Sequence, residues 1–199
     1  MTGTVVTRTW QDHIWIGFIL VALLALGAFG IYVVRAEPDW YLRMRYPLRY
    51  EAIVRAHADT YGLEPSLLAA VIYTESKFDP HAESAAGAIG LMQLLPETAQ
   101  GIADHTGGGR FVVTDLYDPE ISIRYGSWYL QRLRHKYRDH PQALDLALAA
   151  YNAGQGNVDR WVAATPAGQA VRIPFRETRD YLERVHRLQR LYRRAYGLR

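Results

Sequence analysis

The sequence contains no cysteine. This absence excludes disulfide bonds, thiolate metal ligands, a cysteine nucleophile and an anchor attached through a lipid-modified cysteine. Lysine is almost absent too, with only Lys77 and Lys136, so the basic side chains are nearly all arginines. The formal net charge of +3 is a weak positive excess, without the concentrated basic patch of nucleic-acid-binding proteins. We therefore expect no nucleic-acid partner, whereas an anionic polymer or a lipid surface fits this charge.

Several motifs and patterns are also missing. The seven histidines show no HExxH or other spacing typical of metal ligands, so we infer no metal site. The glycines at 107–109 are not followed by Gly-Lys-Ser/Thr, which excludes a phosphate-binding loop. We find no internal repeat and no strand pattern. With 199 residues, 49% of them hydrophobic, the chain can form one compact domain plus an appendage.

The longest uncharged run, Ile14 to Val34, predicts a single membrane-spanning helix, because about 20 apolar residues cross the hydrocarbon core. Aromatic residues that favour the membrane interface lie near its two ends: Trp10, Trp15, Tyr32, Trp40 and Tyr41. A cleaved signal peptide is the alternative, because Val34-Arg35-Ala36 resembles a cleavage site. Its apolar region would be longer than usual, so we favour the anchor.

The distribution of arginines opposes an orientation of this anchor in which the C-terminal part lies outside the cytoplasm. Only Arg8 precedes the span, whereas four arginines follow it: Arg35, Arg43, Arg45 and Arg49. Because basic residues favour the cytoplasmic side, this count alone places the C-terminal part in the cytoplasm. A functional argument is needed to reverse that assignment.

The remainder of the chain reads as helical. Turn residues and capping signals delimit helices at 50–61, from Pro65 onward, at 96–105, from Asp118 toward Arg138, at 142–153, at 157–164 and at 175–196. Pro65 and Asp118-Pro119 are helix-start signals, and Gly154 is a helix-end signal. The sequence therefore predicts an all-α domain.

One acidic residue lies at the end of an apolar helix. Leu67, Val71 and Glu75 follow at four-residue spacing, so the Glu75 carboxylate shares the face of the apolar side chains. Burial disfavours the anion and raises the pKa of a carboxylic acid, as a general acid requires near neutrality. The alternative is an exposed glutamate at a helix end.

Three short motifs occur in a fixed order: Glu75-Ser76, then GLMQ at 90–93 after the small-residue loop SAAGAIG, then AYNAG at 150–154. Together they resemble the catalytic domain of the soluble-lytic-transglycosylase type, glycoside hydrolase family 23, in the lysozyme superfamily. The segments 115–133 and 173–185 look like the middle and C-terminal parts of that domain. The resemblance covers roughly residues 50–190 and implies an α-rich, lysozyme-like fold.

The resemblance implies cleavage of peptidoglycan with Glu75 as the single acid/base. In that family's mechanism the acid protonates the glycosidic oxygen between N-acetylmuramic acid and N-acetylglucosamine, and the acetamido oxygen of the substrate supports the anomeric carbon. The same carboxylate then takes the proton of the C6 hydroxyl, which closes a 1,6-anhydro ring. Neither a cofactor nor a metal ion is implied.

The matching motifs also imply roles for six further residues. Ser76 would orient the acid or contact sugar, and Gln93, with the backbone near Met92, would hold the glycan. Tyr151 would lie close to Glu75 and help place the acetamido group. The remaining two would contact substrate in the same cleft: Asn152 and Tyr181.

Two other functions stay open at this point. A hydrolase similar to goose-type lysozyme would need a second carboxylate, for which the sequence offers Asp79, Glu83, Glu97 and Asp180. A non-catalytic peptidoglycan-binding scaffold would keep the fold without activity. The retained Glu75 favours an enzyme.

These inferences combine into one domain organisation. We expect an N-terminal cytoplasmic segment at 1–13, the transmembrane anchor at 14–34, a connector at 35–49 and the transglycosylase domain at 50–199. Because its substrate lies outside the cytoplasm, we expect the domain to face the periplasm or cell wall from the cytoplasmic (inner) membrane, against the arginine count. The partners would be glycan strands, the membrane and, for a tethered enzyme, an envelope or secretion machinery.

Overall fold

The computed structural model describes residues 10–107, 110–166 and 168–198. The chain divides into two compact units, the first ending at Arg45 and the second beginning at Tyr46. The first nine residues of the expected cytoplasmic segment lie outside the described residues.

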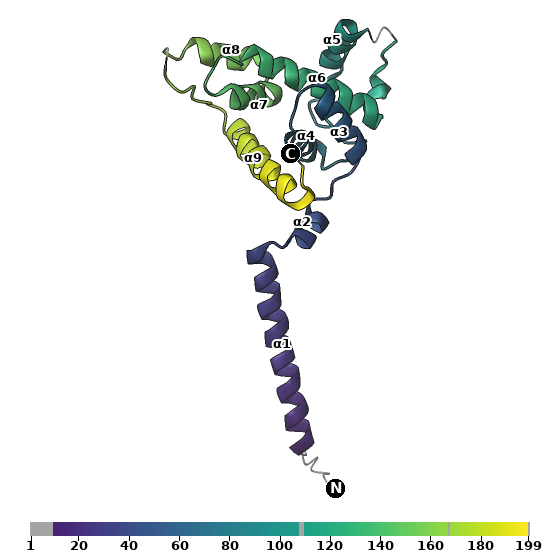
Figure 1. Ribbon diagram of the computed structural model, residues 1–199, viewed down its shortest axis with the longest axis vertical. Helices are drawn as coiled ribbons and strands as arrows, with labels where there is room; N and C mark the ends of the chain where they lie inside the picture. Colours follow the sequence, from purple (N-terminus) through teal and green to yellow (C-terminus); the bar gives the residue numbers. More distant parts are fainter. Residues whose placement is uncertain (1–9, 108–109, 167, 199) are drawn as a thin grey trace, which may run out of the picture. The chain divides into compact units, whose positions relative to one another are not determined.

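The first unit consists of two helices (Figure 1). Helix α1, Trp10–Ala36, contains the predicted apolar run and starts four residues before it. Its part from His13 to Ala36 is long and apolar enough to cross a membrane, by length and composition. The expected connector contains a further short helix, α2, Asp39–Arg45.

The second unit is all-α, as predicted. Its helices are α3 (Glu51–Thr60), α4 (Pro65–Ser76), α5 (Pro96–Thr106), α6 (Pro119–Lys136), α7 (Ala143–Ala153), α8 (Gln155–Ala163), α9 (Arg176–Tyr196) and the short 3-10 helix η1 (Val113–Tyr117). Within the described residues the only β-type pairings are isolated bridges, Glu83 to Ile89 and Ile89 to Leu94. The predicted boundaries agree with these helices to within a few residues, whereas η1 was not predicted.

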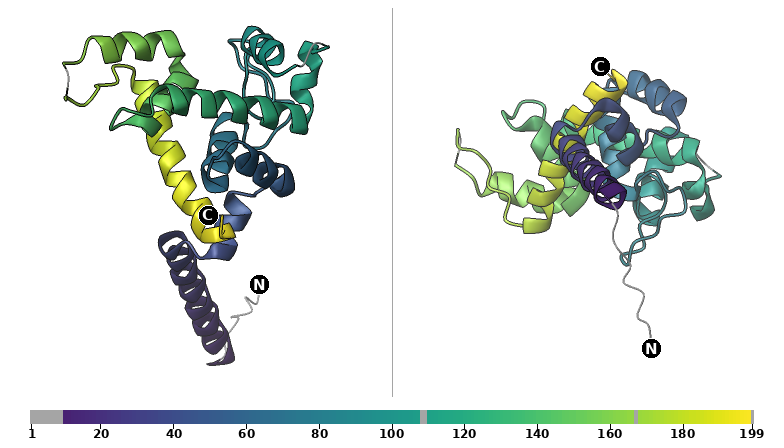
Figure 2. Two further views of the ribbon diagram at one scale, coloured as in Figure 1. Left: turned by 45° about the horizontal axis from the view of Figure 1, so that its top comes forward. Right: turned by 90° about the horizontal axis from the view of Figure 1, so that it is seen from below.

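Helix α4 forms the centre of this unit. Its side chains are buried on nearly all sides, including Leu68, Ala69 and Val71, as expected for a helix that is apolar all round. It packs most extensively against α9, which runs alongside it in Figures 1 and 2. Helix α9 is amphipathic, and its apolar stripe, which includes Leu182, Val185 and Leu188, is buried. This pairing brings the end of the chain against the helix that carries Glu75.

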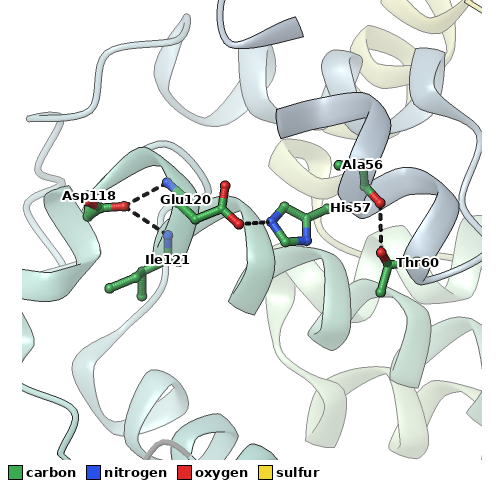
Figure 3. A network of polar contacts seen from close by, with 6 residues as sticks. All are labelled: Ala56, His57, Thr60, Asp118, Glu120 and Ile121. Atoms are coloured by element: carbon green, nitrogen blue, oxygen red, sulfur yellow. Dashed lines mark hydrogen bonds and ion pairs between the residues drawn. The ribbon is translucent and has the colours of Figure 1, made fainter. Parts of the chain in front are cut away.

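Helix α6 crosses the unit and contacts α3, α5 and α7. The Asp118 side chain caps its first turn by accepting hydrogen bonds from the backbone N–H groups of Glu120 at 2.8 Å and Ile121 at 3.1 Å. Glu120 then reaches across to α3, where its Oε1 lies 2.7 Å from Nε2 of the buried His57 (Figure 3). Capping and pairing together fix the start of α6 against α3.

Candidate active site

Glu75 lies in the last turn of α4. The helix ends immediately afterwards because Lys77 and Phe78 both adopt left-handed backbone conformations, with φ of 55° and 63°. Phe78 is fully buried, which fixes this reversal of the chain. The carboxyl group is therefore held at the end of a rigid, buried helix.

The surroundings of Glu75 favour its protonated form. Protein atoms enclose most of the carboxyl group, while the residue keeps partial access to solvent. Burial raises the pKa of Glu75 to about 7, although the hydrogen bond from Tyr181 and the positive charge of Arg184 act in the opposite direction. Near neutral pH, Glu75 can therefore exist in both its protonated and its deprotonated form.

Tyr181 of α9 contacts the acid directly. Its hydroxyl donates a hydrogen bond of 2.8 Å to Oε1 of Glu75. The side chain is buried, with 5% of its surface exposed, and burial together with the Glu75 charge holds the pKa of Tyr181 well above its usual value. Tyr181 therefore stays a neutral donor that orients one oxygen of the carboxyl group.

Tyr151, at the end of α7, is a second tyrosine whose pKa responds to the charge of Glu75. Its hydroxyl donates a 2.7 Å hydrogen bond to the carbonyl oxygen of Met92, and its ring lies 5.6 Å from that of Tyr129. Burial and the nearby Glu75 charge raise the pKa of Tyr151 well above its ordinary value. A neutral phenol is thus fixed beside Glu75.

Met92 connects the site to the hydrophobic core. Its side chain is fully buried. Its backbone N–H donates to Oγ of Ser122 on α6 at 3.3 Å, while its carbonyl accepts from Tyr151 on α7. A Cβ atom built on Gly126 of α6 would lie 2.5 Å from Cε of Met92, so only glycine leaves room for this side chain.

Ser76 and Gln93 brace the loop between α4 and α5. Ser76 is buried, and its Oγ lies 2.9 Å from the carbonyl oxygen of Leu91. Gln93, with a φ of 48°, donates from Nε2 to the carbonyl oxygens of Ala82 at 3.0 Å and Gly90 at 3.1 Å. Both polar groups therefore hold the loop in shape, and their contacts with sugar stay predictions.

Gly90 is required for the shape of the same loop. Its φ is 78°, and a Cβ atom at this position would lie 2.0 Å from the carbonyl oxygen of Leu116. Its N–H donates to the carbonyl oxygen of Ala82 at 2.9 Å. The small-residue loop is thus packed closely against η1.

A pocket of about 240 Å³ adjoins Tyr151. It is lined by Gln93, Leu94, Leu95, Thr98, Tyr129, Tyr151, Asn152, Ala153 and Gly154. Three of the predicted substrate-binding residues therefore meet on one surface: Gln93, Tyr151 and Asn152. Thr98, in the first turn of α5, and Tyr129, in the interior of α6, also line this pocket, and the sequence analysis did not single them out.

The four other carboxylates considered for a second catalytic role are all exposed: Asp79, Glu83, Glu97 and Asp180. Glu83 accepts a short hydrogen bond from Tyr117, and Asp180 lies 3.7 Å from Arg176. Within the described part of the chain, the influences that shift the pKa of Glu75 are burial, Tyr181 and Arg184, and none is another carboxylate.

Comparison with known proteins identifies a family and several relatives of this chain. The family described as "Transglycosylase SLT domain" matches residues 52–172. A membrane-bound lytic murein transglycosylase C of Histophilus somni is 36% identical over 167 residues, covering 73% of this chain and 46% of the relative. The soluble lytic murein transglycosylase of Salmonella typhimurium is 33% identical over 169 residues, covering 79% of this chain and 25% of the relative.

Solved structures of lytic transglycosylases are also similar to this chain. The lytic transglycosylase Slt of Pseudomonas aeruginosa, solved as an inactive mutant, superposes with a TM-score of 0.70 at 31% identity, covering 83% of this chain and 27% of that chain. The 70 kDa soluble lytic transglycosylase of Escherichia coli gives 0.71 at 31% identity, covering 79% and 26%. The chain thus spans about a quarter to a half of the length of these relatives. It belongs to the transglycosylase SLT domain family.

Proposed function

We propose that this protein is a membrane-anchored lytic transglycosylase of murein (peptidoglycan), with Glu75 as its only acid/base. The observation that carries the proposal is the environment of Glu75: burial raises its pKa to about 7, and Tyr181 orients it. The family membership and the names of the relatives, lytic murein transglycosylases, support the choice of substrate.

In the first step the protonated Glu75 gives its proton to the glycosidic oxygen between N-acetylmuramic acid and N-acetylglucosamine. The bond from this oxygen to the anomeric carbon breaks, and the acetamido oxygen of the muramic acid supports the positive charge that develops. The Tyr151 phenol would hold this acetamido group, with Gln93 and Asn152 contacting the sugar from the adjoining pocket. Ser76 and Met92 would keep the pocket wall in position.

In the second step Glu75 acts as a base. Its carboxylate takes the proton of the C6 hydroxyl of the same muramic acid, and O6 bonds to the anomeric carbon. The product is a 1,6-anhydro ring, and Glu75 is protonated again for the next cycle. One carboxylate suffices for this sequence, in contrast to the pair that ordinary glycoside hydrolysis uses.

We infer the location of the enzyme from its proposed substrate and its proposed membrane anchor. Helix α1 would cross the cytoplasmic membrane once, so that the second unit faces the periplasm or cell wall, where murein lies. The Histophilus somni relative, which is named as membrane-bound, supports an attached enzyme. The arginines after α1 oppose this orientation, and access to murein outweighs them.

The test is digestion of purified murein by the full chain in detergent, followed by mass spectrometry of the fragments. We expect 1,6-anhydro ends from the unmodified protein and none from the Glu75→Gln variant. Reducing ends instead would establish a hydrolase, and binding without cleavage would establish a scaffold. Either of these results would overturn the proposal.

A further inference from the structure

A row of arginines on α9 starts beside the catalytic acid and continues away from it. Arg184, Arg187 and Arg190 recur every three residues, so they lie along one side of the helix, and all three are exposed. Arg184 follows Tyr181 by one turn, and its positive charge lowers the pKa of Glu75. The row therefore begins near the carboxyl group of Glu75 and continues along α9 away from Tyr181.

The distal part of the row is available to a ligand. Arg190 makes no hydrogen bond or ion pair with any residue in 10–107, 110–166 and 168–198. Arg187 donates to the hydroxyl of Tyr46 at 3.2 Å and keeps its other guanidinium nitrogens for further contacts. Neither guanidinium is neutralised by a carboxylate among the described residues.

The surface around the row carries both signs of charge. An open hollow on α9 is lined by Asp180, Glu183, Arg184, His186, Arg187 and Arg190. His186 is already paired with Asp145 of α7, at 2.6 Å. A ligand that fits here combines several carboxylates with a smaller number of cationic groups, because a purely anionic surface would be repelled by Asp180 and Glu183.

The peptide stems of murein have this composition. They branch from the muramic acid, the sugar that Glu75 would attack, and they carry free carboxylates together with the amino group of a diamino acid. From Arg184 to Arg190 the helix rises about 9 Å. An extended peptide of about three residues covers the same distance. Guanidinium groups bind carboxylates well because two N–H groups match two oxygens.

We propose that Arg184, Arg187 and Arg190 form a carboxylate-binding row that recognises the peptide stem attached to the muramic acid at the cleavage site. This inference rests on the proposed function and adds a specificity to it: the enzyme prefers strands that carry stems over bare glycan.

The experiment compares two substrates cleaved by the full chain in detergent. One is murein with intact stems, and the other is the same material after an amidase has removed them. The readout is the ratio of kcat/KM on the first substrate to kcat/KM on the second, from the rate at which new chain ends form. Arg190→Glu should lower this ratio roughly fivefold, the scale of one or two exposed ion pairs. Arg190→Lys should retain most of it.

The matched control is Arg138→Glu, which makes the same charge change at an exposed arginine after α6. It should leave the ratio within about twofold of the unmodified protein. A thermal melt of each variant checks that the fold is retained. The double variant Arg187→Gln with Arg190→Gln gives a second measurement without charge reversal, and it should lower the ratio as well.

Three results would overturn the inference. If the α9 variants lose the same factor on both substrates, the row acts on the glycan or on Glu75 and not on the stems. If the ratio is unchanged, the row does not contact stems. In both cases the proposed cleavage of murein still stands. If the unmodified protein cleaves neither substrate, the proposed function fails and the inference fails with it.

Discussion

The Tyr181 hydroxyl donates a 2.8 Å hydrogen bond to Oε1 of Glu75, although 106 positions separate the two residues in the chain. This bond stabilises the carboxylate and so opposes the larger effect of burial on the pKa of Glu75. The packing of α9 against α4 therefore helps to set the protonation of the proposed acid/base.

Replacement Tyr181→Phe should raise the pKa of Glu75 above about 7, because it removes the hydrogen bond that favours the carboxylate. We expect the alkaline limb of the pH profile of kcat/KM to move to higher pH, and the maximum activity to fall about tenfold as the acid loses its orientation. Initial rates of murein cleavage between pH 5 and 9 measure both effects. A limb that moves to lower pH would contradict this account.

Glu75 should also make stability depend on pH. Its pKa in the folded protein, about 7, exceeds the ordinary value of 4.5 expected in the unfolded chain. The folded state therefore retains the proton more strongly, and the free energy of unfolding falls as pH rises from about 4.5 to about 7. The free energy of unfolding falls by at most about 3 kcal/mol, because a difference of one pKa unit corresponds to about 1.36 kcal/mol.

The Glu75→Gln variant lacks this titration, so it should be more stable than the unmodified protein at pH 8 by about 2 kcal/mol and similar to it near pH 4.5. Urea unfolding of both proteins at the two pH values measures the difference in their free energies of unfolding. The same variant should lose at least 1,000-fold in activity, on the scale of general acid catalysis. Equal differences in stability at both pH values would refute a raised pKa.

Tyr151→Phe removes the hydrogen bond to the carbonyl oxygen of Met92 without changing the ring. We expect a loss of about 1 kcal/mol in the free energy of unfolding, the net contribution of a typical hydrogen bond. We also expect a fall in kcat of tenfold or more, because the phenol would no longer hold the acetamido group. A variant with full kcat would show that this hydroxyl serves the fold alone.

Gly126→Ala should damage the site from within the core, because the new Cβ would lie 2.5 Å from the Met92 side chain. Overpacking of this kind costs about 1 to 3 kcal/mol. The matched control is Gly101→Ala in α5, where nothing lies within 4 Å of the added atom. There alanine should stabilise the helix by about 0.5 to 1 kcal/mol. Thermal melts of the two variants should therefore shift in opposite directions.

The orientation of the anchor is tested in spheroplasts. If α1 crosses the cytoplasmic membrane as proposed, protease added outside intact spheroplasts should digest the unit that begins at Tyr46. A cytoplasmic marker protein in the same sample must stay intact. Protection of the unit would reverse the orientation and favour the one indicated by the arginines after the span.

The helices were predictable because their signals are local. Pro65 begins α4 and Gly154 follows α7 because of their own backbone preferences, and Asp118 caps α6 with its own side chain. The family motifs also predicted Glu75 as the acid/base, and this assignment stays a prediction. Helix α2 lies in a stretch that we interpreted only as a connector.

The contacts that complete the site were not predictable in the same way. Ser122 and Gly126 lie in the interior of α6. A glycine inside a helix is a signal of close packing, but the sequence does not show which side chain packs there. In the structure Met92 contacts both residues. The burial of Ser76 depends on a loop whose path is set by Gly90 and Gln93. Such roles depend on tertiary packing, which has no period along the sequence.

The backbone of Met92 is hydrogen-bonded on both sides of its Cα atom, because its N–H donates to Ser122 of α6 and its carbonyl oxygen accepts from Tyr151 of α7. It cannot tilt unless one of these helices releases it. Its amide hydrogen should therefore exchange with deuterium as slowly as those of the core helices, although Met92 belongs to a loop. The wall of the pocket would then be as rigid as the core, and any movement that admits a glycan strand must occur elsewhere around the cleft.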